Sequence, residues 1–131
     1  MRKDVSNLLP KATTYESICD TFAWDLPAEL NMAHEVCDRW AEADPERIAL
    51  IDRTGERDCE ISFEQLRAMA DELAAYLQSL GVKRGDCVGV LRRQSLWTAA
   101  GHIAIWKLGA VSLPLSPLFG AGALSSRLSD A

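Results

Sequence analysis

A helix that is apolar on most of its sides, set between two short apolar runs, constrains the fold of this chain more than any other part of the sequence. The apolar runs cover residues 87–91 and 110–115, and the helix covers roughly residues 96–108. Ser95 is suited to cap its start, and Gly109 is suited to end it. A helix of this kind must be covered on more than one side, and two strands joined by a helix form a right-handed parallel β-α-β unit. We therefore predict an α/β fold whose two strands are buried on both faces.

The residues before this unit predict one helix and one hairpin. Asn31 is a good N-cap for an amphipathic helix over about 32–43, and Pro45 follows the point where that helix ends. The runs 48–51 and 59–62 are strand-like and are joined by a polar turn. That pattern predicts an antiparallel β-hairpin.

Two further helices are indicated by their ends. Ser62 and Gln65 match a capping box, in which each side chain satisfies a free backbone N–H group of the other residue. Apolar residues then recur at helical spacing, which predicts a helix over 63–80 that Gly81 terminates. Another helix is expected from near Ala121 towards residue 129.

The predicted sheet is incomplete. A parallel sheet of two strands is not stable alone, and the β-α alternation calls for another strand after residue 131. We expect a truncated α/β domain over 21–131, preceded by a loosely ordered leader over 1–20 that lacks hydrophobic periodicity. Residues 22–27 are expected to form an extended strip on a larger body. Without further strands, marginal stability and exposed apolar surface are expected at Val88, Val90, Val111 and Leu113.

The charge and cysteine pattern excludes several classes of protein. Lys and Arg number 14 against 19 Asp and Glu, and the net charge of −5 provides no basic surface for nucleic acid. The four cysteines, at positions 19, 37, 59 and 87, are spaced too widely for a C-x-x-C site. We therefore expect reduced thiols, no metal site and no nucleic-acid partner.

Neither a signal peptide nor a membrane span is predicted. Residues 1–14 carry charges and lack an apolar run of the length that a signal peptide needs. The most apolar region, 97–118, is interrupted by His102, Lys107, Gly109 and two prolines. A cytoplasmic location is therefore expected.

Residues 22–131 resemble the start of the AMP-forming acyl-CoA synthetases, closest to the acetyl- and medium-chain branch. The order and spacing of several short segments carry this resemblance. They are 22–27 with Asn31, 39–41, 49–51, 62–66, 80–86, 105–111 and 114–120. The resemblance implies the amino-terminal portion of the family's large domain.

The resemblance implies an acid–thiol ligase that converts ATP, a carboxylic acid and coenzyme A into acyl-CoA, AMP and pyrophosphate. A complete enzyme of this kind uses ATP, Mg²⁺ and coenzyme A. The family's phosphate loop, acidic metal-binding motif, ribose-binding Asp and catalytic Lys are not in this sequence, and none of its four lysines (3, 11, 83 and 107) lies in such a glycine-rich loop. No catalytic, cofactor or metal residue is therefore assigned, and the chain is expected to be inactive alone. The alternative is a non-catalytic interaction module that completes its sheet with a complementing synthetase chain.

One segment is a candidate for ligand contact in a complete enzyme. Ligands of open α/β sheets bind beyond the carboxyl ends of the strands, so Ser116, Phe119 and Gly120 are candidates to line the acyl or coenzyme A crevice. The same turn superficially resembles a phosphate-binding loop, but its spacing matches neither the dinucleotide nor the P-loop pattern. Crevice lining is the favoured interpretation.

The remaining notable side chains are expected to pack. His34 and His102 lie on different predicted helices without nearby ligands, and Trp40 and Trp106 fit a helix core. Trp97 is the exception, because it replaces the acidic residue that the family prefers near a helix start and is expected to be exposed.

Overall fold

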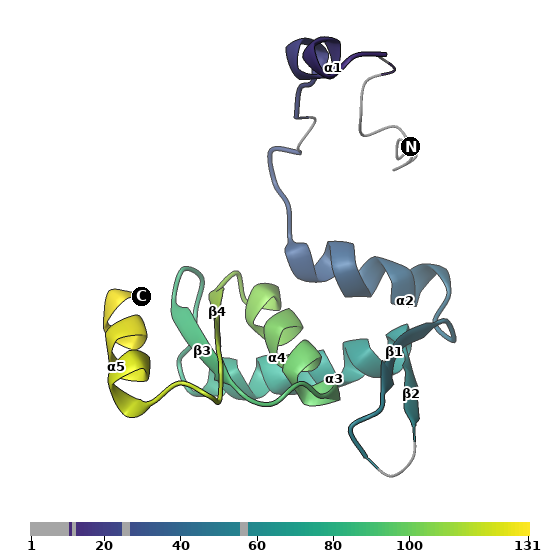
Figure 1. Ribbon diagram of the computed structural model, residues 1–131. Coiled ribbons are helices and arrows are strands. Elements are labelled where there is room, and N and C mark those ends of the chain that lie inside the picture. The colour runs from purple at the N-terminus through teal and green to yellow at the C-terminus, as the bar shows by residue number, and fades with distance from the viewer. Residues whose placement is uncertain (1–10, 12, 25–26, 56–57) are drawn as a thin grey trace.

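The computed structural model describes residues 11, 13–24, 27–55 and 58–131. Most of the predicted leader, part of the predicted surface strip (25–26) and part of the hairpin turn (56–57) lie outside the described residues. The elements run in the order α1, η2, α2, β1, β2, α3, β3, α4, β4 and α5 (Figure 1).

A short helix, α1 (Tyr15–Thr21), lies in the region where no periodicity predicted one. It begins with a capping box in which the Thr14 hydroxyl accepts a hydrogen bond from the Ser17 N–H at 3.2 Å. None of its residues is buried, and it stands apart from the other elements (Figure 1). After it, the rings of Phe22 and Trp24 meet edge to face at 4.9 Å. Local capping bonds therefore account for this helix, because its side chains pack against no core.

The helix predicted over 32–43 is confirmed, except that its middle is a π-helical turn rather than α-helix. Asn31 Oδ1 accepts a hydrogen bond from the Ala33 N–H at 2.9 Å, as an N-cap does. The middle is a π-helical turn, η2 (His34–Asp38), and the remainder is α2 (Arg39–Ala43). The sequence pattern predicted the helix but not the change of hydrogen-bond spacing within it.

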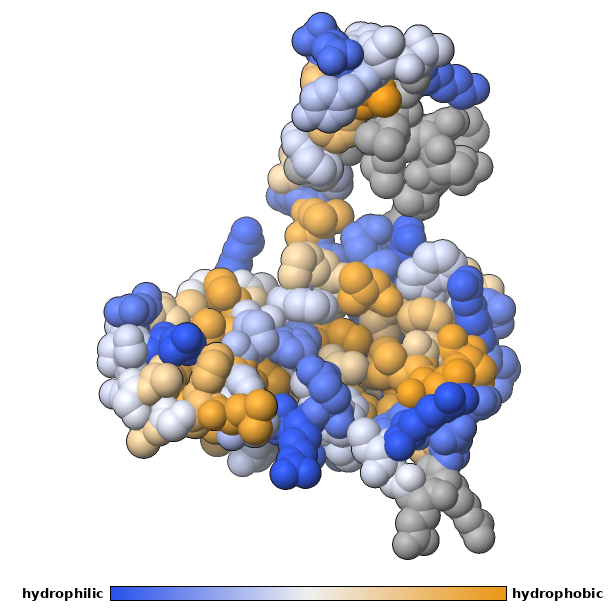
Figure 2. Space-filling view, viewed as in Figure 1, coloured by the Kyte–Doolittle hydropathy of each residue, from blue (hydrophilic) through white to orange (hydrophobic). Residues whose placement is uncertain are grey.

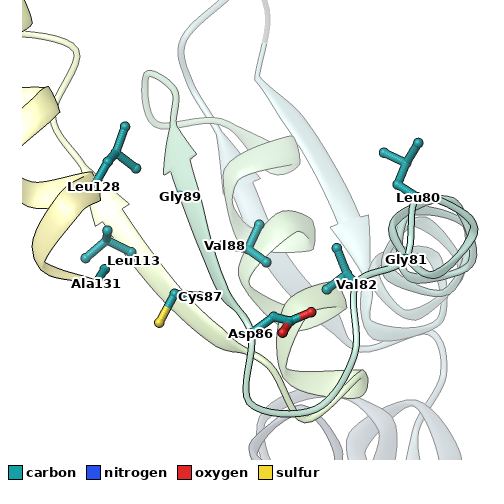
Figure 3. A pocket seen from close by; sticks show the side chains of 10 residues that line it. All are labelled: Leu80, Gly81, Val82, Asp86, Cys87, Val88, Gly89, Leu113, Leu128 and Ala131. Atoms are coloured by element: carbon teal, nitrogen blue, oxygen red, sulfur yellow. The ribbon is translucent and has the colours of Figure 1, made fainter.

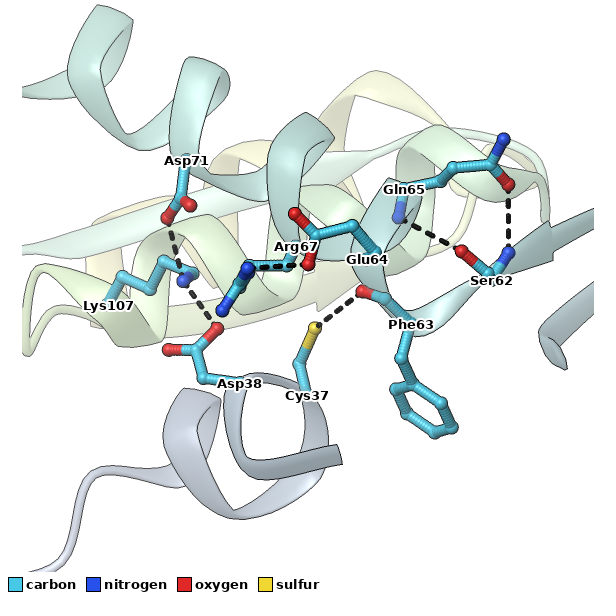
Figure 4. A network of polar contacts seen from close by, with 9 residues as sticks. All are labelled: Cys37, Asp38, Ser62, Phe63, Glu64, Gln65, Arg67, Asp71 and Lys107. Carbon is cyan, nitrogen blue, oxygen red and sulfur yellow. Dashed lines mark hydrogen bonds and ion pairs between the residues drawn. The ribbon is translucent and has the colours of Figure 1, made fainter. Parts of the chain in front are cut away.

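The hairpin and the capping box are also confirmed. Strands β1 (Ile48–Asp52) and β2 (Cys59–Ser62) pair antiparallel, with an irregularity between Ile48 and Leu50. Helix α3 (Phe63–Ser79) follows directly. The Ser62 N–H donates to Gln65 Oε1 at 2.9 Å, and the Gln65 N–H donates to Ser62 Oγ at 3.3 Å (Figure 4). The chain therefore turns from strand to helix without leaving these donors unpaired.

The β-α-β unit forms as predicted. Strands β3 (Cys87–Leu91) and β4 (Val111–Leu115) pair in parallel and are joined by α4 (Leu96–Lys107). Gly109, at φ 69°, ends α4 because its N–H and that of Ala110 donate to the last carbonyls of the helix. Gly81, at φ 94°, ends α3 in the same way. Helix α5 (Ala121–Asp130) then closes the described chain.

The core lies between α3, α4 and the π-helical turn. Leu66 and Ala70 of α3 pack with Ala100 and Ile103 of α4, and Ala33 and Cys37 complete the cluster. Helix α4 passes α3 at Gly101, where an added Cβ would lie at an ordinary contact distance of 3.9 Å from the Leu73 side chain. Helices α3 and α4 cover one side of the β3–β4 pair, and α5 lies on the other side (Figure 1).

The two parallel strands are less buried than predicted. Side chains along β3 alternate between exposed and half-buried, so the expectation of burial on both faces is wrong for the described chain. Val111 is 52% exposed, as expected in the absence of further strands, whereas Val88, Val90 and Leu113 are half-buried. Apolar residues reach the surface next to α5 and over the hairpin (Figure 2). The sheet lacks cover because strands are missing on either side of it among the described residues.

Candidate functional site

The turn between β4 and α5 brings the three predicted crevice residues together. The Ser116 carbonyl accepts a hydrogen bond from the Phe119 N–H at 3.0 Å, and Ser116 Oγ accepts one from the Leu118 N–H at 3.2 Å. Gly120 precedes α5 and offers no side chain to cap it. Leu118 is 94% exposed at the tip of the turn. The turn is therefore fixed by its own hydrogen bonds while its tip faces solvent.

Arg127 reaches back from α5 to this turn. Its guanidinium lies 4.2 Å from the centre of the Phe119 ring, and its Nη1 donates to the Ala123 carbonyl at 3.0 Å. A cation over an aromatic face is attractive and restricts the ring. The sequence pattern did not indicate this pair, although Arg127 lies less than two helical turns into α5 and can therefore reach back to Phe119. The turn thus offers an aromatic wall with one positive charge beside it.

A polar cluster lies between α4, η2 and α3 (Figure 4). Lys107 Nζ lies 2.6 Å from an Asp38 carboxylate oxygen and 2.7 Å from an Asp71 carboxylate oxygen. Its side chain is 14% exposed. Burial lowers the pKa of Lys107, but the hydrogen bonds to Asp38 and Asp71 outweigh it and the pKa is raised. This ammonium is committed to two carboxylates and is not available to a phosphate.

Cys37 is buried beside this cluster. Its Sγ lies 4.0 Å from the Phe63 carbonyl oxygen (Figure 4). Burial, with a smaller contribution from Asp38, raises the pKa of the thiol to about 11. A thiol that stays protonated at neutral pH is a poor nucleophile. All four cysteines are free, as expected, although only Cys37 is buried.

Asp52 of the hairpin caps the start of α4, a contact that the sequence did not predict. Ser95 is the N-cap residue by position, as predicted, but its side chain makes no capping bond to the backbone. Instead, the Leu96 N–H donates to Asp52 Oδ2 at 3.3 Å. Asp52 Oδ1 also accepts from the Thr54 hydroxyl, and these hydrogen bonds lower the pKa of Asp52. The hairpin thus anchors the β-α-β unit.

Two open hollows flank the parallel strands. One, of about 500 Å³, lies beside β3 and is lined by residues of the α3–β3 loop and of α5 (Figure 3). The other, of about 510 Å³, lies beside β4 and is lined mainly by Met32, His102, Trp106, Val111 and Pro114. The His102 and Trp106 rings stack there at 5.9 Å. Neither hollow includes the Ser116–Phe119–Gly120 turn.

The AMP-binding enzyme family matches residues 37–131, which hold both strands of the β-α-β unit and the core helices α3 and α4. This chain belongs to that family. The resemblance to AMP-forming synthetases is therefore confirmed.

The relatives of this chain are much longer than it. The chain is 38% identical over 112 residues to acetyl-coenzyme A synthetase 2 of Kluyveromyces lactis, covering 83% of the chain and 16% of that protein. It is 35% identical over 111 residues to acetyl-coenzyme A synthetase of Coprinopsis cinerea, covering 82% of the chain and 17% of that protein. The chain thus spans about one sixth of the length of these relatives.

Solved structures confirm the α/β fold of the chain. The inhibitor-bound N-terminal domain of FACL13 from Mycobacterium tuberculosis matches with a TM-score of 0.70 and 26% identity, over 77% of this chain and 25% of that chain. The NpsA N-terminal subdomain from Klebsiella oxytoca matches with a TM-score of 0.67 and 27% identity, over 76% and 25%. The described elements therefore form part of an adenylate-forming enzyme's amino-terminal domain.

The described residues hold no group of three His, Cys, Asp or Glu side chains placed to bind a metal ion. Within the same residues, each helix is too short or too polar to cross a bilayer. His34 and His102 lie on different elements, on η2 and α4, as expected. Trp97 is 49% exposed at the start of α4, which confirms that expectation.

Proposed function

We propose that this chain is the amino-terminal part of an acid–thiol ligase, and that it contributes structure rather than chemistry. The ligase would convert ATP, a carboxylic acid and coenzyme A into acyl-CoA, AMP and pyrophosphate. The observation that supports this proposal is the match to acetyl-coenzyme A synthetases over more than four fifths of the chain. ATP, Mg²⁺ and coenzyme A would be bound by the remainder of such an enzyme.

The arrangement of charged groups supports a non-catalytic role. Transfer of an acyl or phosphoryl group needs cations and backbone N–H groups aimed at the reacting atoms. Lys107 is paired with two carboxylates, and the Arg127 guanidinium lies on Phe119. Neither cation is free to approach a phosphate without losing these contacts. Alone, the chain is therefore expected to be inactive.

Ser116, Phe119 and Gly120 are proposed to form one wall of the acyl or coenzyme A crevice. They follow the carboxyl end of β4, where ligands of open α/β sheets bind. Phe119→Ala in the complete native enzyme should raise the KM for the acid or for coenzyme A by about tenfold, because about 1.4 kcal/mol of contact free energy is lost. Tyr76→Ala is the matched control, since Tyr76 is exposed on α3. Equal constants for both variants would contradict the proposed wall.

The reaction is proposed to occur in the cytoplasm, as part of fatty acid metabolism. Three free thiols, those of Cys19, Cys59 and Cys87, are exposed. Exposed free thiols persist in reducing compartments. This observation supports the location and does not bear on the acid.

The experiment that tests the ligase role begins with the native gene product. An antibody against the exposed segment 13–24 should capture a product several times larger than 14.4 kDa that shows acid-dependent ATP–pyrophosphate exchange. The purified 131-residue chain should show no exchange. Exchange by the chain alone would contradict the non-catalytic role, and a lone 14.4 kDa product without exchange or a companion chain would contradict the ligase role.

The second candidate function is that of an interaction module which completes its sheet with a complementing synthetase chain. The open sides of the β3–β4 pair and the two hollows beside it favour this candidate. A 14.4 kDa product that copurifies with a longer chain carrying the phosphate loop would favour it over a continuous enzyme.

A further inference from the structure

The turn that carries Phe119 fixes its own backbone but not the Phe119 ring. The Ser116 carbonyl and hydroxyl accept hydrogen bonds from the Phe119 and Leu118 N–H groups. These bonds do not fix the ring, because rotation about its side-chain bonds moves no backbone atom. The residues that follow add no restraint, since a Cβ added at Gly120 or Gly122 would meet open space. The half-buried ring therefore needs a side-chain contact from outside the turn to stay in one orientation.

Arg127 supplies such a contact from α5. Its guanidinium lies 4.2 Å from the centre of the Phe119 ring, within the range of about 6 Å in which a cation attracts an aromatic face. The guanidinium is also held at a second point, because its Nη1 donates to the Ala123 carbonyl at 3.0 Å. The ring is thus attracted to a group that is itself tethered to the helix.

The backbone from which Arg127 extends is placed by its neighbour, Leu128. A Cβ at Gly89 would lie 3.3 Å from the Leu128 side chain and 3.3 Å from the Leu115 side chain (Figure 3). The missing side chain at Gly89 therefore lets Leu128 rest against β3. Leu115 is buried and directly precedes Ser116. The same point on β3 thus locates both the start of the turn and the helix that carries Arg127.

The geometry favours an indirect role for Arg127 over a direct contact with a ligand. The guanidinium lies over one face of the Phe119 ring, so a ligand would meet the other face or the edge of the ring. To bind an anion itself, Arg127 would have to give up the ring or the Ala123 carbonyl. Its effect on a ligand should therefore pass through Phe119.

We infer that Arg127 is a positioning residue, which holds the Phe119 ring in the orientation that forms a wall of the acyl or coenzyme A crevice. This inference rests on the proposed function, in which that wall contacts a ligand. Without the guanidinium the ring would occupy several rotamers, and ligand binding would have to order it. A wall that contacts substrate and transition state equally affects KM and leaves kcat unchanged.

The test is a double-mutant cycle in the complete native enzyme, with kcat and KM measured for the acid, coenzyme A and ATP. Arg127→Met keeps an unbranched side chain and removes the charge. It should raise the same KM that Phe119→Ala raises, by about threefold, the effect of an exposed cation–π contact. The double variant should match Phe119→Ala alone at about tenfold, whereas independent effects would multiply to about thirtyfold. Arg127→Lys keeps a cation and should stay within about twofold of the unmodified enzyme.

A second measurement does not depend on activity. With para-fluorophenylalanine in place of phenylalanine, the fluorine resonance of Phe119 is identified by its loss in Phe119→Ala. That resonance should shift in Arg127→Met, because the charge over the ring is gone. Arg53→Met is the matched control for both measurements, since Arg53 is exposed and pairs with Asp58. It should change neither the resonance nor any KM.

Three results would overturn the inference. An unchanged KM in Arg127→Met would show that the ring keeps its position without the charge, and an unchanged fluorine resonance would show the same in the absence of any substrate. A thirtyfold increase in the double variant would mean that Arg127 acts on the ligand apart from Phe119. A native product without acid-dependent ATP–pyrophosphate exchange would instead contradict the ligase role, and the fluorine resonance would then decide whether Arg127 positions the ring.

Discussion

The two sides of the β3–β4 pair are covered by different helices and are packed very differently. On one side, α3 and α4 share a core in which Ala70 and Ala100 are fully buried, and the Lys107 cluster joins them to η2. On the other side, α5 has no buried residue and no side-chain cap, and Leu128 is 54% exposed. The difference shows that the first side has a packed core within this chain, whereas the second has apolar surface that nothing in the described chain covers.

The largest expected effect is a cavity in the packed side. Ile103→Ala should lower the free energy of unfolding by about 3 kcal/mol, because a buried side chain between α3 and α4 is lost. Leu128→Ala on α5 should cost less than about 1 kcal/mol, since that side chain is already half in solvent. Urea titration of both variants measures the contrast. Equal losses would show that the two sides are equally packed.

The next effect comes from the Lys107 cluster. Lys107→Ala should destabilise the chain by about 2 kcal/mol, because it leaves the Asp38 and Asp71 carboxylates facing each other without a partner. Arg53→Ala is the control, because its pair with Asp58 is largely exposed and should contribute at most about 1 kcal/mol. If the two variants lost the same stability, the cluster would not be what joins α4 to η2.

The free energy of unfolding is expected to depend on pH through Cys37, which lies on the same packed side. Its pKa is raised from 9.0 to about 11, so the folded chain retains the thiol proton more strongly than the unfolded chain does. That contribution is fully present below pH 9 and is lost as the pH rises from about 9 to about 11, by on the order of 2 kcal/mol. Thermal melts of the chain and of Cys37→Ala across this range measure it. An identical slope in the two proteins would exclude Cys37 as the cause.

The smallest expected effect is a gain in stability, on the side of the sheet that α5 covers. Gly122→Ala should stabilise α5 by about 1 kcal/mol, because the new methyl group meets open space and alanine is the better helix former. Gly109→Ala should instead destabilise the chain, since Gly109 has a positive φ and a Cβ there would lie 3.1 Å from Arg84. Helix content by circular dichroism and the unfolding midpoint report both changes. A loss of stability in Gly122→Ala would mean that α5 needs glycine there for another reason.

Much of the fold was predictable because its signals are local. The Ser62–Gln65 capping box, Asn31 and the glycines at 81 and 109 act within a few residues of their own position. The helix α1 was missed because it is only seven residues long and the Thr14–Ser17 capping box at its start was not recognised. The crevice turn was predicted as a segment, while the contact of Arg127 with Phe119 was not.

The sequence by itself determined the order and limits of most helices and strands, and the family to which the chain belongs. Only the tertiary structure decided that Asp52 holds the start of α4, that Lys107 joins three elements, and that α5 lies opposite α4. The physical reason is how far apart in the sequence the interacting residues lie. Caps and turns are bonds between near neighbours in the chain, whereas these contacts link residues tens of positions apart and depend on which surfaces meet after the elements have packed.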